Sequence, residues 1–144
     1  MNHVVRRHRD SVLICLPLRL VNETNAREHW AARCGRAKTH RQIAGWTAKP
    51  CVLGMSPPYR VMITRIGPRR LDDDNLAASA KHVRDGIADA LGIDDGDPRI
   101  AWMYDQRRCG PRDVTLEGYG VEVCITVVTA KTLSASRPSE RSDA

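Results

Sequence analysis

The sequence of 144 residues contains no Phe, and its only aromatic side chains are three Trp and three Tyr. No apolar run approaches the ~20 residues that a membrane-spanning helix needs. The five cysteines are scattered, without a C-x-x-C pair or a His at zinc spacing. We therefore expect reduced thiols, no zinc site and no association with a membrane.

A recognisable export signal is also missing. The basic residues 1–10 precede an apolar stretch at 11–18, which superficially resembles a signal peptide. Arg19 directly follows that stretch, and no small-residue cleavage site is present. We interpret residues 12–21 as a first strand that enters the core, and we expect a cytoplasmic protein.

The length and the 42% hydrophobic content are sufficient for one compact domain, predicted over residues 1–131. Alternating or continuous apolar patterns predict strands at 12–21, 52–55, 59–66, 98–108 and 119–128, and helical patterns cover 26–44 and 76–91. This order predicts an α/β (α+β) fold, with a mixed sheet of four or five strands and two helices. Residues 132–144 are Ser-rich and charged, which predicts a disordered tail.

Charge is divided unevenly along the chain. Residues 1–71 carry 14 Lys and Arg against three Asp and Glu, whereas residues 72–144 carry nine against 14. A basic half beside an acidic cluster suits a polyanion held against metal-loaded carboxylates. A basic surface that only contacts solvent is the alternative.

The first predicted helix combines a start signal with a basic face. Asn25 followed by Glu28 resembles a capping box, which predicts a helix from residue 26 to about 44. Trp30, Cys34 and Ala37 form a candidate core stripe of this helix. The candidate DNA-binding residues are Arg27, Arg33, Arg36, Lys38 and Arg41, which would contact phosphates unless this face is only solvated.

Two acidic clusters stand at the two ends of the second predicted helix. They are Asp72, Asp73 and Asp74 before it, and Asp94, Asp95 and Asp97 after Gly92. A single Asp is enough for an N-cap, and acids after the helix lie at the unfavourable end of its dipole. Mg²⁺, which prefers oxygen ligands, explains the pattern better than an acidic surface with capping.

The arrangement of such a metal site depends on the path of the chain. Asp72 and Asp74 point the same way if that segment is extended. Asp95 would join them if the chain after the helix folds back beside the start of the helix.

Cationic and aromatic residues near the acidic clusters have two interpretations each. Lys81 either forms a surface ion pair with Asp85 or places positive charge on a phosphate. Arg69 and Arg70 hold DNA beside the metals or reduce the repulsion among the aspartates. Trp102 and Tyr104, on one face of the strand predicted at 98–108, stack on exposed bases or pack in the core or in a dimer interface.

The combined pattern resembles a known family. It consists of Arg-Arg-x-Asp-x-Asp-Asn, a helix with Lys and Asp four residues apart, and an Asp-Asp pair before a strand. The residues that match are Arg69, Arg70, Asp72, Asp74, Asn75, Lys81, Asp85, Asp94 and Asp95. This arrangement resembles the RusA family of Holliday junction resolvases, common in phages and prophages. The interval from Asp-Asn to Lys is longer here than in the best-known member.

The resemblance implies a Mg²⁺-dependent endonuclease that cleaves four-way DNA junctions as a homodimer, in recombination and repair. It implies that Asp72, Asp74 and Asp95 are the catalytic metal ligands, with Asp94 beside them, and that Lys81 is the catalytic lysine. Two other classes stay open: a non-catalytic protein that binds structured DNA, and a different metal-dependent phosphohydrolase.

Overall fold

The computed structural model describes residues 3–22 and 27–129, so the predicted tail at 132–144 lies outside the described residues. Five strands form one sheet: β1 (Val4–Arg7), β2 (Ser11–Leu16), β3 (Tyr59–Ile66), β4 (Ile100–Arg107) and β5 (Gly120–Val127). Their order is β1-β2-β5-β3-β4, and only the β3–β4 pair is parallel. The predicted α/β class with a mixed sheet is confirmed.

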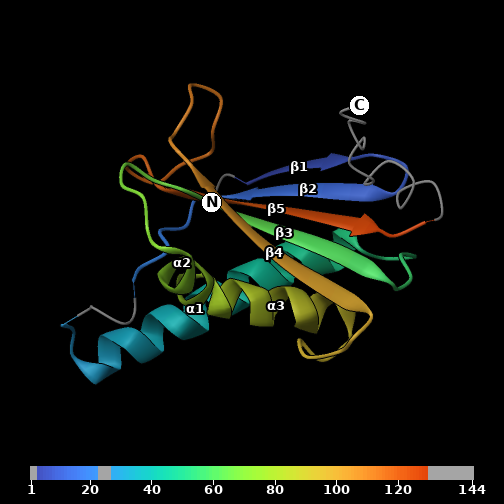
Figure 1. The fold of residues 1–144 in the computed structure, drawn as a ribbon, viewed down its shortest axis with the longest axis horizontal. Helices are drawn as coiled ribbons and strands as arrows, with labels where there is room; N and C mark the ends of the chain where they lie inside the picture. The colour runs from blue at the N-terminus through green and yellow to red at the C-terminus, as the bar shows by residue number, and fades with distance from the viewer. Residues whose placement is uncertain (1–2, 23–26, 130–144) are drawn as a thin grey trace, which may run out of the picture.

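The described helices number three rather than two. They are α1 (Trp30–Ala48), which continues into the short 3₁₀ helix η1 (Lys49–Cys51), α2 (Asp73–Ser79) and α3 (Lys81–Leu91). All three α-helices lie on one side of the sheet (Figure 1). The helices α2 and α3 form the crossover from β3 to its parallel neighbour β4, since parallel strands cannot be joined by a tight turn.

The core lies between the sheet and the C-terminal part of α1 together with α3. Alternate residues of the strands face it, as the burial pattern of β2 illustrates, where every second side chain is buried. Its largest fully buried side chains are Ile14, Leu16, Val61, Ile63, Val83, Ile87, Val121, Val123 and Ile125. The hydrophobic effect of burying this face fixes which way each strand is turned.

The first helix differs from its prediction. It begins at Trp30, where the Nδ1 atom of His29 accepts a hydrogen bond from the Ala31 N–H at 3.2 Å, and it continues to Ala48. Asn25 lies outside the described residues. The predicted core stripe is wrong, because Trp30 is 74% exposed and the buried residues of α1 are His40, Ala44 and Ala48. The N-terminal half of α1 extends past the sheet (Figure 1).

The second helix is divided at Ala80. The N–H of Ala80 shares its hydrogen bond between the carbonyl oxygens of Leu76 and Ala77, and the Ser79 hydroxyl donates to Leu76 O at 2.7 Å. A serine that bonds back to its own helix competes with the regular backbone ladder. The predicted end is confirmed, because Gly92 is the C-cap with a φ of 69°, a conformation that glycine adopts without strain.

Several strand boundaries also differ. The strand β1 was not predicted, because its four residues are all exposed and two are arginines. Residues 52–55 form no strand. The strand β2 ends at Leu16 rather than at residue 21, since Pro17 has no N–H to donate to a neighbouring strand. The strand β3 is confirmed with its predicted bounds, and β4 and β5 lie within theirs.

The helices α1 and α3 are in close contact at two glycines, Gly45 and Gly86. A Cβ atom on Gly86 would lie 2.3 Å from the carbonyl oxygen of Arg41 and 3.0 Å from the Ala44 Cβ. We expect Gly86→Ala to lower the free energy of unfolding by about 1–3 kcal/mol, because the helices must separate. Urea unfolding measures this loss.

The matched control is Gly35→Ala, on an exposed part of α1 where an added Cβ meets no atom within 4 Å. It should raise stability by roughly 0.5–1 kcal/mol, because Ala is the better helix former. Equal effects of the two substitutions would contradict the close contact.

Candidate functional site

Two buried polar side chains hold the loop 67–72, which joins β3 to α2. Arg65 on β3 and Gln106 on β4 are register partners, and they are only 6% and 8% exposed. The Gln106 amide accepts from Leu71 N–H at 2.9 Å and donates to Leu71 O at 2.6 Å. Arg65 Nη1 donates to Arg69 O at 2.7 Å. These bonds fix the loop against the ends of both strands, and Asp72 is its last residue.

The first acidic cluster is exposed at the start of α2. Asp72 occupies the N-cap position, yet its carboxylate accepts no backbone N–H and instead accepts from Asn75 Nδ2 at 3.0 Å. Capping therefore does not account for this side chain. The backbone is extended at Asp72 and helical from Asp73, so the extended segment that was expected to align Asp72 with Asp74 is absent.

The second acidic cluster is held elsewhere. Asp95 Oδ2 pairs with Arg84 Nε at 3.2 Å, and its carbonyl accepts from Arg84 Nη2 at 3.0 Å and from Trp102 Nε1 at 2.8 Å. The Asp94 carboxylate accepts from Gly96 N–H at 2.8 Å. Within residues 3–22 and 27–129, no three His, Cys, Asp or Glu side chains are arranged to hold a metal ion.

The path of the chain explains this separation. After α3 the chain enters β4, which runs parallel to β3, and it is the far end of β4, at Gln106, that returns to Leu71. Asp95 precedes β4 and is fixed to Arg84 and Trp102. The structure does not bring Asp95 to Asp72 and Asp74, and their joint role as metal ligands stays a prediction.

Lys81, at the start of α3, lies on the side of the second cluster. It lines a cavity of about 450 Å³ together with Asp85, Asp94 and Asp95. Within the described chain no ion pair joins Lys81 to Asp85, so the simple surface pair is not formed. The cavity gives Lys81 an acidic environment without a fixed partner.

The two aromatic residues of β4 pack against α3. The guanidinium carbon of Arg84 lies 4.9 Å from the centre of the Trp102 ring, and Arg84 Nη1 donates to Tyr104 OH at 3.0 Å. Both rings are half-buried. Packing within the chain therefore accounts for Trp102 and Tyr104.

The basic residues of α1 do not form one solvated face. Arg36 pairs with Glu28 at 2.6 Å, and Arg41 makes two hydrogen bonds to Asp89 on α3 at 2.7 and 3.0 Å. The hydrogen bond from Arg41 holds the Asp89 pKa below its usual range. Of the remaining candidates, Arg27 and Lys38 are exposed and Arg33 is half-buried. Their contact with DNA stays a prediction.

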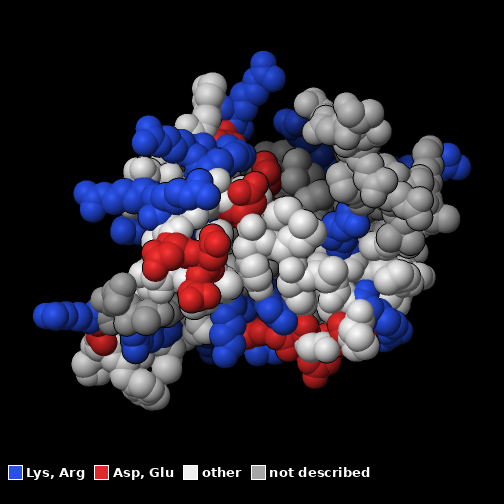
Figure 2. All heavy atoms as spheres, viewed as in Figure 1, with Lys and Arg blue, Asp and Glu red and all other residues white. Residues whose placement is uncertain are grey.

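A denser group of arginines lies beside the loop 67–72. We call it the arginine cavity: it measures about 310 Å³, and its basic lining consists of Arg65, Arg69, Arg70, Arg107 and Arg108. Figure 2 shows basic side chains gathered at this end of the sheet, directly beside an acidic group over α2. Arg65 and Gln106 were missed by sequence reasoning; the signal available was a polar residue at a core-facing position of each strand.

One of these arginines is already neutralised. Arg107 makes two hydrogen bonds to Asp113, at 2.6 and 2.7 Å, and one to Glu122 at 3.1 Å. In contrast, Arg69, Arg70 and Arg108 have exposed side chains, and none forms an ion pair within the described part of the chain. Most of the positive charge of the arginine cavity is thus without a counter-charge.

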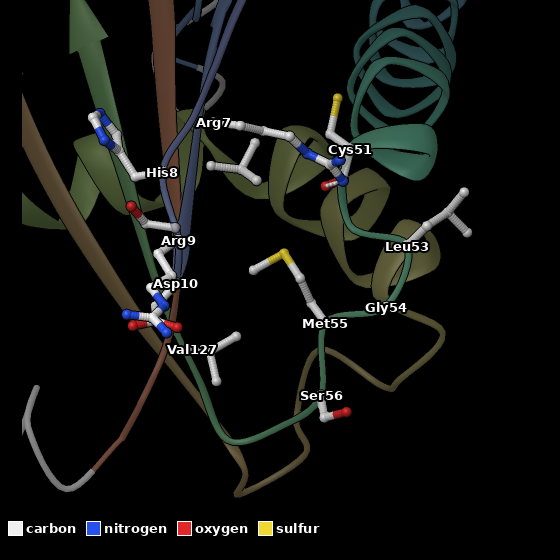
Figure 3. A pocket seen from close by; sticks show the side chains of 12 residues that line it. Arg7, His8, Arg9, Asp10, Cys51, Leu53, Gly54, Met55, Ser56 and Val127 are labelled. Carbon is white, nitrogen blue, oxygen red and sulfur yellow. Dashed lines mark hydrogen bonds between the residues drawn. The ribbon is translucent and has the colours of Figure 1, made fainter.

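A separate cavity of about 430 Å³ lies between the β1–β2 turn and the chain after η1 (Figure 3). Arg7 Nη2 donates to Cys51 O at 2.5 Å along this cavity, which links β1 to the end of η1. Met55 and Val127 project toward it. None of the predicted site residues lines it, so it is not part of the candidate site.

Comparison with known proteins leaves the family open. No family model matches the chain. An uncharacterized protein of Xylella fastidiosa is 42% identical over 84 residues, a match that covers 49% of this chain and 51% of that protein. The chain thus spans about half the length of this relative.

Two solved structures resemble the fold at low identity. The periplasmic domain of Helicobacter pylori MotB has a TM-score of 0.49, with 14% identity over 93% of this chain and 87% of that one. The cell wall anchor of the Pseudomonas aeruginosa T6SS has a TM-score of 0.45, with 14% identity over 88% of each chain. Likenesses at this level carry no argument about function.

The expected cytoplasmic location is withdrawn. Both solved structures come from proteins described as periplasmic or as a cell wall anchor. The sequence argument for the cytoplasm used only a missing export signal and reduced thiols, and we withdraw that location. No helix in the described part of the chain is long and apolar enough to cross a membrane.

Replacing Gln106 tests the anchoring of the loop. We expect Gln106→Leu to lower the free energy of unfolding by about 1–3 kcal/mol, because it leaves the Leu71 N–H and C=O without their partners. Hydrogen exchange of the Leu71 amide should accelerate as well. Gln42→Leu, on an exposed position of α1, is the control and should change stability by less than about 0.5 kcal/mol. Unchanged exchange at Leu71 would refute the anchoring.

The pKa of Asp113 tests its pairing with Arg107. The hydrogen bond from Arg107 holds the Asp113 pKa below its usual range. A carboxyl whose pKa is lower in the folded state contributes stability above its unfolded pKa, and this contribution is lost as pH falls through its folded pKa. In Arg107→Met the Asp113 pKa should rise towards the usual range of an aspartate, as measured by NMR titration of the carboxyl carbon.

The internal control for this titration is Asp97. Hydrogen bonds from Arg99 hold its pKa at about 2, and neither residue contacts Arg107. The Asp97 pKa should therefore be the same in Arg107→Met and in the wild type. An Asp113 pKa that also stays unchanged would show that the Arg107 pair does not form in solution.

Proposed function

We propose that this protein is a Mg²⁺-dependent endonuclease that cleaves four-way DNA junctions as a homodimer. The observation that carries the proposal is the placement of the exposed carboxylates of Asp72, Asp73 and Asp74 at the end of the loop that lines the arginine cavity. Carboxylates suit a divalent cation, and arginines suit the phosphates of a nucleic acid. The two kinds of group are brought together by one loop.

The residues at the start of α2 fit Mg²⁺ in part. A hard cation such as Mg²⁺ requires carboxylate oxygens that are available to bind it. Among the described residues, no Lys or Arg forms an ion pair with Asp72 or Asp74, and Asp72 accepts a hydrogen bond from the Asn75 amide. Asp95 is engaged by Arg84 and does not reach them. When bound, Mg²⁺ would polarise a phosphodiester and activate water for its hydrolysis. The role of this chain would be to hold the cation with Asp72 and Asp74.

DNA would be held by the unpaired arginines of the loop. Contacts from arginine to phosphate supply most of the affinity that does not depend on base sequence. A guanidinium can also bind two phosphate oxygens at once. With Arg69 and Arg70 only a few residues from Asp72 and Asp74, the arginines would orient the backbone of the DNA strand beside the carboxylates.

The proposed homodimer follows from the substrate. A four-way junction has near two-fold symmetry, and its resolution requires paired nicks in opposed strands. A symmetric dimer presents two equivalent sites related by the same symmetry. Each protomer would contribute one set of carboxylates and one arginine cavity.

A second candidate is a protein that binds junctions without cutting them. The Arg84–Asp95 ion pair favours it, because the third carboxylate of the matched pattern is already used within the chain. Such a protein would retain the arginine cavity and bind DNA whether or not Mg²⁺ is present.

Cleavage of a synthetic four-way junction distinguishes these functions. We expect paired nicks that require Mg²⁺, cease in EDTA and do not occur in linear duplex. Asp74→Asn should reduce the cleavage rate at least ~100-fold while junction binding is retained. Loss of a group that only supports a metal ligand lowers activity by up to that factor, so loss of a ligand itself should cost at least as much. Asp97→Asn, outside the proposed metal ligands, is the matched control and should cleave normally.

Three other results of this cleavage experiment would contradict the proposed nuclease or its residue assignment. Tight junction binding without any cleavage in Mg²⁺ would replace the nuclease by the non-catalytic candidate. Equal cleavage of junction and duplex would reject specificity for four-way junctions. Normal cleavage by Asp74→Asn would reject the assignment of the carboxylates.

A further inference from the structure

Arg65 is a buried cation without a counter-charge. Its side chain faces the helix side of the sheet at the end of β3, and the residue is 6% exposed. Nη1 donates to Arg69 O, whereas Nε has no hydrogen-bond partner within the described residues. No ion pair of Arg65 is present there either. A buried guanidinium normally has an anionic partner, because its desolvation is otherwise uncompensated.

The surroundings of Arg65 do not supply that partner. Desolvation lowers the Arg65 pKa, and the positive charge of Arg19 lowers it further; Tyr119 acts in the opposite direction. Arg19 itself lies over the Tyr119 ring, 4.3 Å from its centre. The carboxylates of Asp113 and Glu122 are bound to Arg107, which also lines the arginine cavity.

Gly67 leaves one side of this guanidinium open. A Cβ atom at this position would lie 3.1 Å from Cζ, Nη1 and Nη2 of Arg65. Gly67 and Arg65 both line the arginine cavity, and Arg69, Arg70 and Arg108 line it from the loops. At about 310 Å³ the cavity has room for a tetrahedral anion with its waters, since one water takes about 30 Å³.

We propose that the arginine cavity binds one phosphate group, with Arg65 as its buried anchor and Arg69, Arg70 and Arg108 as exposed contacts. The charge and the number of N–H donors favour a phosphate over a carboxylate, which would need a single guanidinium. Resting on the function proposed above, the phosphate would belong to the backbone of the DNA strand beside Asp72. Arg65 would then fix the position of the strand rather than take part in the reaction.

Inorganic phosphate is the first probe, added to the full chain in the absence of DNA. The N–H group at Arg65 Nε gives a signal of its own in a ¹H–¹⁵N spectrum of the wild type. We expect this signal to shift with added phosphate along a saturable curve, while an equal concentration of chloride leaves it in place. The thermal midpoint should rise along the same curve.

Two variants test the residue assignment. Arg65→Met keeps an unbranched apolar side chain and removes the charge, and it should abolish the stabilisation by phosphate. Arg112→Met, an exposed arginine that does not line the cavity, is the matched control and should respond like the wild type. If Arg65→Met fails to fold, the wild-type Nε signal still decides the question. An unshifted signal would overturn the proposal.

DNA binding supplies the second arm. With a four-way junction, Arg65→Met should lower the slope of log K against log salt concentration by about one, as the loss of one phosphate contact does. Phosphate binding at Arg65 without any DNA binding would reject the function proposed above and leave the anion site intact. Junction cleavage with an unchanged salt slope in Arg65→Met would instead reject the role of Arg65.

Discussion

The candidate site depends on hydrogen bonds from the ends of two parallel strands to one loop. Gln106 holds both backbone groups of Leu71, and Arg65 holds the carbonyl of Arg69. Because parallel strands end at the same edge of a sheet, both side chains emerge beneath the same loop. The loop carries Arg69 and Arg70 at this edge of the sheet and ends with the carboxylate of Asp72 at the start of α2. Without these bonds the basic and acidic groups would have no fixed relation.

Much of the fold could be predicted from local patterns, and the failures have physical causes. The strand β3 and the end of α3 at Gly92 followed from alternation and from a glycine suited to a left-handed C-cap. The strand β1 could not be predicted, because an exposed edge strand buries no face that would impose a pattern. The core stripe of α1 was predicted in the N-terminal half of the helix, whereas its buried residues lie in the C-terminal half. The sequence of the helix does not indicate which of its turns pack against the sheet.

The candidate site was predictable only in its composition. The spacing of the acids and arginines identified the loop and the start of α2, but the position of Asp95 depends on the return path of β4, which is a property of the topology. The same holds for Arg65, whose importance arises from burial and from the lack of an ion-pair partner among the described residues. A polar residue on a core-facing position marked it in the sequence, but only the packing reveals that its charge is uncompensated.

The proposed function requires that the carboxylates at the start of α2 form a divalent metal site. The most direct measurement is the amide spectrum of ¹⁵N-labelled protein titrated with Mn²⁺, a paramagnetic substitute for Mg²⁺. We expect the amides of residues 72–75 to broaden first, at less than one equivalent, and added Mg²⁺ to restore them. Broadening that begins at residues 94–97 while residues 72–75 stay sharp, or no selective broadening at all, would contradict it.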